Sequence, residues 1–242
     1  MDKIKLGFVP TRRSIFSAPD AIKYRGLTAD RLREIGVEIV DIDDINDEGL
    51  LFDDSHIAPI VEKFRAEGVD GIMLCHANFG TEYVCARLAR ELGLPVLLWG
   101  PRDERPEPDG TRLRDSQCGL FATGKVLRRF QVPFTYMTNC RLTDPEFERG
   151  VWDFLAVCNV VKTFKHTRIL QMATRPFDFW STMCNEGELL EKFNIQLSPI
   201  PMTELVQIAV YSGGVGACAL RLQMLQNVGG TYCVLTVVDE VV

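Results

Sequence analysis

The sequence predicts an α/β fold of two Rossmann-like lobes, each a doubly wound, mainly parallel sheet between layers of helices. Three observations lead to this prediction. Short apolar runs alternate with segments of helical periodicity along most of the 242 residues. The connections between them are short, which favours parallel strands joined by right-handed crossovers. The composition, 46% hydrophobic and 25% charged, is ordinary for a globular protein with an apolar core.

The first lobe, residues 1–142, is expected to hold five strands. "IKLGFV" (4–9) is a continuous apolar-rich run, which is typical of a strand buried on both faces. Residues 19–36 then space apolar side chains at helical intervals, with Pro19 suited to the first turn and Gly36 to the C-cap. The elements expected after these are strand 37–42, helix 54–68, strand 69–74, helix 81–93, strand 94–100, helix 120–130 and strand 132–138.

A polar segment, 101–119, interrupts this alternation between the fourth strand and the next helix. It is rich in Pro, Asp and Arg, and it is too long and too charged for a tight turn. Two interpretations stay open for it: an excursion at the carboxyl edge of the sheet, or a solvated surface loop.

The second lobe, residues 143–242, is predicted to be an incomplete or truncated Rossmann-like domain that begins with a bridging helix over 143–166. Asp144 is the N-cap candidate of this helix, and Pro145 suits its first turn. The low charge of the tail predicts that it completes the second sheet, because an exposed apolar tail would aggregate. The elements expected after the bridging helix are strand 168–174, helix 177–193, strand 195–201, a strand, glycine turn and helix over 207–226, and a strand within 229–242.

Charge and composition exclude several classes of protein. The net charge of −6 gives no basic footprint for a nucleic-acid partner. No stretch approaches the roughly 18 apolar residues of a membrane helix, and the N-terminal apolar run is too short for a signal peptide, so we expect a cytoplasmic protein. Eight cysteines are spread singly, without a CxxC pair, which indicates buried reduced thiols rather than zinc knuckles or disulfides.

Polar side chains follow the first and third predicted strands. Residues 11–14 ("TRRS") follow the first strand, and Cys75, His76 and Asn78 end the third. Ligands of open α/β sheets bind beyond the carboxyl ends of the strands. Neutral donors and arginines suit a polyhydroxylated or carboxylated small molecule, whereas a metal prefers converging carboxylates or histidines. The three histidines lie in different elements, so we assign no metal site, and a structural histidine and a solvated basic turn remain open alternatives.

A nucleophilic pair of Cys75 and His76 is disfavoured. Adjacent residues of a strand point to opposite faces of the sheet, so their side chains cannot readily hydrogen-bond to each other.

"SGGVGACA" near the chain's end fits G-x-G-x-x-A through Gly214, Gly216 and Ala219, with Asp239 some twenty residues later. Such a turn could bind a dinucleotide pyrophosphate at the helix N-terminus. A glycine-rich strand–helix turn without a ligand is the simpler interpretation, because short patterns of this kind are often false positives.

From residue 3 to about 207 the sequence resembles the N-terminal half of the L-fucose/L-arabinose isomerase family. This resemblance implies two stacked Rossmann-like domains and a third, C-terminal domain. It also implies an oligomer in which a divalent ion, typically manganese, helps carboxylates to interconvert aldoses and ketoses. The stretches that carry the resemblance are "KLGFVPTRRSIFS", "GVDGIMLCHANFGTE", "LPVLLWGPRDE", "FKHTRILQMATRPFDFWSTMCNE" and "LLEKFNIQLSPIPMTEL".

The resemblance also implies four site residues. The "TRRS" turn aligns with a family position where an arginine reaches sugar, often in an adjacent subunit's site, so Arg13 or Arg12 would be its counterpart. "HANFG" aligns with a second wall of the substrate site, where Asn78 would supply a hydrogen-bonding amide and Phe79 an apolar plane. The family's metal ligands lie downstream of the matched part. We therefore assign no catalytic residue and no cofactor to this chain, and expect Mn²⁺ in the full-length family.

The expected function is that of a sugar isomerase-related protein. The chain would supply a substrate rim and an oligomerisation surface, and would not be catalytically complete alone. Its expected partners are a small sugar and further copies of itself. One alternative is a non-catalytic sugar-binding module, since two α/β lobes with a bridging segment resemble periplasmic-type binding proteins. Another is a nucleotide-binding protein that uses Gly214 and Gly216.

Overall fold

The computed structural model describes residues 3–165, 167–172, 174–201, 203–204 and 232–235. The chain divides into two compact units after Asn159. Each unit contains a parallel sheet with helices, so the predicted α/β class is confirmed. The division falls inside a long helix, whereas the sequence placed its boundary at residue 142; that assignment of domains stays a prediction.

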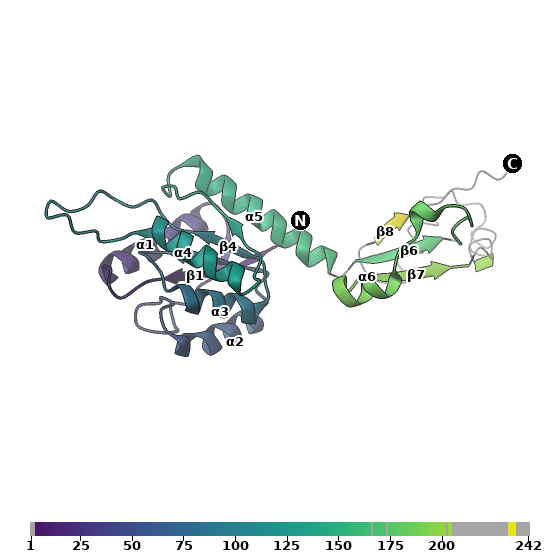
Figure 1. The fold of residues 1–242 in the computed structure, drawn as a ribbon, viewed down its shortest axis with the longest axis horizontal. Coiled ribbons are helices and arrows are strands. Elements are labelled where there is room, and N and C mark those ends of the chain that lie inside the picture. The colour runs from purple at the N-terminus through teal and green to yellow at the C-terminus, as the bar shows by residue number, and fades with distance from the viewer. Residues whose placement is uncertain (1–2, 166, 173, 202, 205–231, 236–242) are drawn as a thin grey trace. The chain divides into compact units, whose positions relative to one another are not determined.

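The first unit is built on a five-stranded parallel sheet. Its spatial order is β2-β1-β3-β4-β5, and every neighbouring pair is parallel. Figure 1 labels two of its strands, β1 and β4. All five strands lie where the sequence predicts them, but the two edge strands are shorter than expected. The bounds are β1 (Lys5–Thr11), β2 (Glu38–Val40), β3 (Gly71–His76), β4 (Val96–Trp99) and β5 (Thr135–Tyr136).

Helices cover both faces of this sheet, as the continuous apolar runs of the central strands require. Alternate strand residues enter different cores: Leu74 packs with one layer of helices, and its neighbours Met73 and Cys75 pack with the other. The first layer contains α2 (Ile57–Glu67), α3 (Glu82–Leu92) and α4 (Ser116–Arg129), and the second contains α1 (Ala18–Glu34) and α5 (Pro145–Phe164).

The strand order creates a switch point between β1 and β3. The chain leaves β1 toward β2 on one side and leaves β3 toward β4 on the other. In doubly wound sheets of this order, the crevice beyond the carboxyl ends of these two strands is the usual ligand site. The polar residues predicted after the first and third strands therefore meet at this edge of the sheet.

Side chains cap the starts of α1 and α4, and the cap of α4 is distant in sequence. Ser17 accepts a hydrogen bond from the Asp20 amide at 3.2 Å at the start of α1. At α4 the Asp103 carboxylate accepts from the amides of Ser116, at 3.0 Å, and Gln117, at 3.4 Å. This remote cap explains why α4 begins four residues before the predicted start at 120.

The second unit contains a three-stranded parallel sheet of order β7-β6-β8. Its strands are β6 (Arg168–Met172), β7 (Gln196–Ile200) and β8 (Tyr232–Leu235). Because β8 pairs with β6, the prediction that the tail adds a strand to the second sheet is confirmed. The glycine pattern at Gly214 and Gly216 lies outside the described residues.

The predicted helix 177–193 is wrong in its first half. Helix α6 spans only Glu186–Phe193, and the segment before it holds a short 3₁₀ turn, η2 (Trp180–Thr182). Asn185 caps the observed start by accepting from the Glu188 amide at 3.2 Å. The aromatic and hydroxyl residues before this cap are weaker helix formers than the Glu- and Leu-rich segment after it, so the periodic apolar pattern alone was misleading.

Two sequence-based exclusions can be compared with the structure. Among the described helices, none is long and apolar enough to cross a membrane. Where cysteine side chains are described, all six are free thiols, but Cys118 and Cys184 are exposed instead of buried.

Two glycines offer a test of this packing. A Cβ at Gly26, inside α1, would meet no atom within 4 Å, whereas at Gly7 in β1 it would lie 2.5 Å from the buried ring of Phe64. We expect Gly26→Ala to raise the free energy of unfolding by about 0.5–1 kcal/mol through helix propensity. Gly7→Ala should lower it by about 1–3 kcal/mol through overpacking. Urea unfolding measures both, and a stable Gly7→Ala would contradict this packing of α2.

Candidate functional site

The chain segments that leave β1 and β3 lie side by side and are hydrogen-bonded to each other. The two strands end in register at Thr11 and His76. Beyond them the Ala77 amide donates to the Thr11 carbonyl at 3.1 Å. The Thr81 amide donates to the Thr11 hydroxyl at 3.2 Å, and the Thr81 hydroxyl donates to the Arg12 carbonyl at 2.7 Å. The structure thus brings the two polar segments found in the sequence into one surface.

Asn78 is fully buried beneath this surface, between the two segments. Its Oδ1 accepts from the amides of Arg13, at 2.9 Å, of Gly80, at 3.3 Å, and of Phe79. Its Nδ2 donates to the carbonyls of Arg13 and Ser17, each at 3.3 Å. Both donors and both lone-pair directions of the amide are therefore used inside the chain. The geometry gives Asn78 a positioning role, and its direct contact with a ligand stays a prediction.

Arg13 and Phe79 form an accessible stack on the same surface. The guanidinium carbon of Arg13 lies 5.0 Å from the centroid of the Phe79 ring. That ring is stacked on Phe16, with centroids 5.3 Å apart and planes 9° from parallel. Arg13 also contacts Glu82, at 3.3 Å between Nη1 and Oε1, and its side chain is 41% exposed. The Arg13–Phe79 stack thus presents part of an aromatic ring and charged donors at the carboxyl edge of the sheet.

Arg12 has different surroundings. It binds Glu48 through two nitrogens, with Nη2 at 2.8 Å from Oε1 and Nε to Oε2. Its guanidinium carbon lies 3.8 Å above the Phe52 ring, and only 12% of its side chain is exposed. Arg12 therefore ties the β1 exit to the loop after β2. Of the two arginines predicted at this turn, Arg13 is the accessible one.

Cys75 and His76 face opposite sides of the sheet, as predicted. Cys75 packs with the core between the sheet and α1, and burial raises the pKa of its thiol to about 12. His76 points to the other side, where Nδ1 donates to the Phe79 carbonyl. Because Nδ1 carries the proton, the buried Nε2 is unprotonated, and no described residue hydrogen-bonds to it. Burial lowers the pKa of His76 to about 4, so neither residue can act as half of a nucleophilic pair.

Sequence reasoning missed Arg114, which lies in the polar segment after β4. Its side chain is fully buried and donates to the carbonyls of Ala77, at 3.3 Å, and Arg102, at 2.8 Å. Its guanidinium carbon lies 3.6 Å from the Tyr24 ring. The burial of Arg114 could not be recognised from composition, because it is one of several arginines in a charged segment. Arg114 lies two residues before α4, but the sequence predicts that helix only from residue 120, so no sequence signal distinguishes this arginine.

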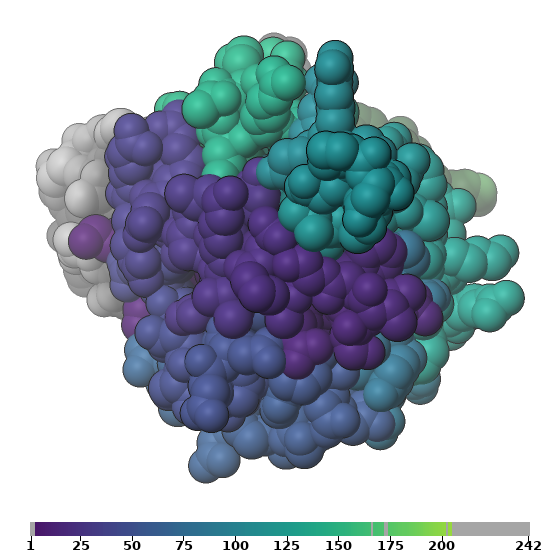
Figure 2. Space-filling model, turned by 90° about the vertical axis from the view of Figure 1, so that its left-hand side faces the viewer, coloured from purple at the N-terminus to yellow at the C-terminus, as the bar shows by residue number. Residues whose placement is uncertain are grey.

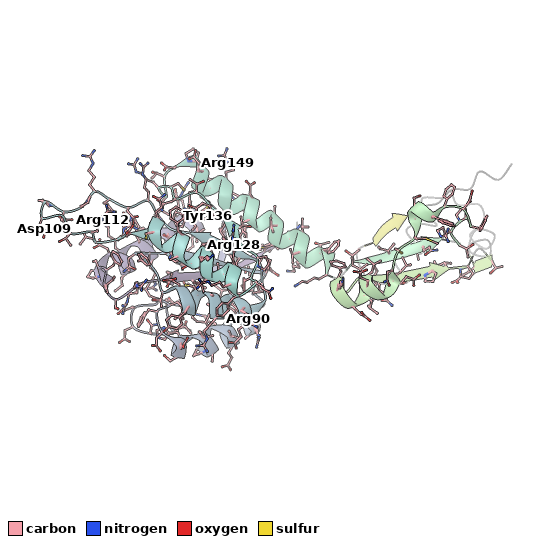
Figure 3. All side chains as sticks on the ribbon, viewed as in Figure 1. Arg90, Asp109, Arg112, Arg128, Tyr136 and Arg149 are labelled. Atoms are coloured by element: carbon pink, nitrogen blue, oxygen red, sulfur yellow. The ribbon has the colours of Figure 1, made fainter. Side chains whose placement is uncertain are left out.

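Both interpretations of the polar segment hold in part. Its root is anchored at the carboxyl edge, where Arg114 lies, while residues 104–113 are all exposed. We call residues 104–113 the arm. In Figure 3, Asp109 and Arg112 lie at its outer end, away from the sheet. Figure 2 faces this side of the unit and shows the teal segment beside the purple N-terminal part of the chain.

The described residues were compared with the ligand sets that hold metal ions in proteins. Within those residues, no three His, Cys, Asp or Glu side chains lie close enough together to hold an ion. A metal-dependent step therefore cannot be derived from these side chains.

One family model matches the chain. Its description is "Fucose/sulfoquinovose isomerase, N-terminal domain", and it covers residues 7–165. This interval includes more than half of the chain and all of the switch-point residues described above. No curated protein matches the chain.

The buried His76 predicts a pH-dependent stability. Its pKa is lowered from the ordinary 6.5 to about 4, so the unfolded chain binds the proton more tightly. The stabilisation is present above pH 6.5 and is lost as pH falls from there toward 4. We expect the free energy of unfolding to drop by about 2 kcal/mol between pH 7 and pH 5.

Urea unfolding at a series of pH values measures this effect. His76→Asn retains a donor toward the Phe79 carbonyl but cannot titrate, so most of the pH dependence should disappear in this variant. His56→Asn is the control and should retain it. An unchanged profile in His76→Asn would assign the effect to other groups.

Proposed function

Because the chain belongs to the fucose/sulfoquinovose isomerase N-terminal domain family, we propose that it frames the sugar in an aldose–ketose isomerase. The resemblance seen in the sequence is thereby confirmed at the level of the family. The proposal adds a role for the switch point: the Arg13–Phe79 stack is a wall of the sugar site. It also adds assembly with further copies of the chain.

The partly exposed Arg13–Phe79 stack is the observation that carries the proposal. A pyranose or furanose ring has an apolar C–H face and a hydroxyl edge. The exposed part of the Phe79 ring suits the apolar face of the sugar, and the guanidinium donors of Arg13 suit its hydroxyl groups. Both lie beyond the carboxyl ends of β1 and β3, which is where doubly wound sheets bind small molecules.

The chemistry of isomerisation needs more than this wall. A proton must move between adjacent carbons, and a divalent ion polarises the two oxygens when bound. The described residues bring no ligand set together for such an ion. We therefore propose that Mn²⁺ and the proton-moving groups belong to other polypeptide of the assembly. The described residues would bind the sugar, orient it and exclude water from one side.

We further propose that the sugar is uncharged. Arg12 is neutralised by Glu48, and Arg13 by Glu82, so the surface offers no surplus positive charge to a sulfonate or carboxylate. The alternative of a non-catalytic sugar-binding module would use the same wall and differs only in the absence of turnover. Nucleotide binding through Gly214 and Gly216 stays a prediction.

The sugar wall can be tested by Arg13→Ala. We expect the dissociation constant for the preferred sugar to rise about tenfold or more, because a charge-assisted hydrogen bond contributes roughly 1.5–3 kcal/mol. Calorimetric titration of the assembled protein with pentoses and deoxyhexoses provides the measurement. Arg65→Ala is the matched control, since Arg65 is an exposed arginine in the last turn of α2, at the opposite edge of the sheet. Absence of heat with every sugar would exclude the proposed function.

Selectivity for an uncharged sugar can be tested by Glu82→Gln. Loss of this carboxylate leaves the charge of Arg13 unpaired, which should favour an anionic ligand. We expect the preference for a 6-deoxyhexose over a 6-sulfonated hexose to fall by about two- to fivefold, as for a partly exposed ion pair. Glu91→Gln, at the other end of α3, should leave the ratio unchanged. A sulfonated sugar preferred by the unmutated protein would disprove the assignment.

A further inference from the structure

Arg114 is a charged side chain with no exposed surface, and it lies outside the Arg13–Phe79 stack. Burying a guanidinium is strongly unfavourable unless its donors are hydrogen-bonded. Here it donates to the Ala77, Pro101 and Arg102 carbonyls. It also donates to the Glu104 carboxylate at 3.0 Å. An apolar residue of similar size would stabilise the fold equally well. The presence of a cation is therefore better explained by the positions in which it holds its partners.

The partners of Arg114 come from two strand exits and from helix α1. Ala77 follows β3, Pro101 and Arg102 follow β4, and Tyr24 belongs to α1, which follows β1. A guanidinium is a planar fork with fixed donor directions, so these partners are held at fixed positions relative to one another. A lysine at the same position would keep the charge and lose this fork.

A direct connection runs from Arg114 to the turn that carries Phe79. The Ala77 carbonyl accepts from Arg114 Nη1 at 3.3 Å, and the Ala77 amide donates to the Thr11 carbonyl at 3.1 Å. The peptide units on both sides of Ala77 are therefore fixed immediately before Asn78 and Phe79.

A second connection runs through α4. Arg114 Nη2 lies 3.6 Å from the Asp103 carboxylate, and this carboxylate caps α4 through the Ser116 amide at 3.0 Å. One turn later, Gly119 packs against the Phe79 turn so closely that an added Cβ would lie 1.8 Å from the Phe79 carbonyl oxygen. A shift in the start of α4 would thus displace the turn.

We propose that Arg114 is a positioning residue for the sugar: through Ala77 and Asp103 it holds the Phe79 ring in place. The inference rests on the proposed function, since it concerns the same wall. Arg114 itself does not contact the sugar.

The primary test is Arg114→Lys, with Arg112→Lys as the matched control. Arg112 lies on the exposed arm and makes no hydrogen bond or ion pair with a described residue. We expect Arg114→Lys to weaken sugar binding about tenfold, the order of one misplaced contact. The backbone amide resonances of Phe79 and Gly80 should also move in NMR spectra. The control should change neither, when all measurements are made well below the thermal unfolding midpoint of every variant.

A double-mutant cycle separates positioning from general stability. If Arg114 acts through the Phe79 ring, Arg114→Lys should change sugar affinity less than about twofold in a Phe79→Leu background. If the two substitutions instead reduce sugar affinity by independent factors that multiply, the proposal is overturned. A residue that only stabilises the fold, or one that contacts the sugar directly, would give that result.

The two proposals can fail separately. If the unmutated protein binds no pentose or deoxyhexose, the proposed function fails, and the Phe79 and Gly80 resonances still decide the role of Arg114. Unchanged resonances in Arg114→Lys overturn it. If that variant does not fold, Asp103→Asn tests the second connection, because Asp103 is less buried than Arg114. Movement of the same two resonances supports the proposal, and their constancy overturns it.

Discussion

The amide of Asn78 joins the exits of β1 and β3, and the rest of the candidate site depends on this connection. Five hydrogen bonds from one buried side chain fix the backbone of Arg13 and of the Phe79 turn. Parallel strands alone would bring the two exits near each other, but would leave their loops free to move independently. The Asn78 amide holds the two loops together, and this places Arg13 next to Phe79.

Much of the first sheet could be predicted from the sequence, because buried parallel strands produce continuous apolar runs. The interior of β3 is such a run, and its position was predicted within a few residues. The site was predictable only in outline. The choice between Arg12 and Arg13 depends on Glu48 and Glu82, which are distant in sequence and whose pairing requires the tertiary fold.

The burial of Arg114 also could not be predicted from the sequence. A charged residue in a Pro- and Asp-rich segment has the sequence signature of a solvated loop. Its burial results from carbonyls at two strand exits that the chain brings together only on folding. In the second unit, the helix predicted over 177–193 exceeds α6, because the apolar periodicity continues upstream of the Asn185 cap where the helix begins.

The exposed arm has a practical consequence. Its tip carries a turn closed between Glu107 and Gly110, while its root is held by Arg114 and by the Leu113 carbonyl, which accepts from the Ser17 amide at 3.0 Å. A peptide tag or fluorophore-bearing sequence inserted at such a tip adds little closure entropy and leaves the root undisturbed. The arm is thus a natural attachment point for a reporter on the first unit, with its root tied to the chain at Ser17.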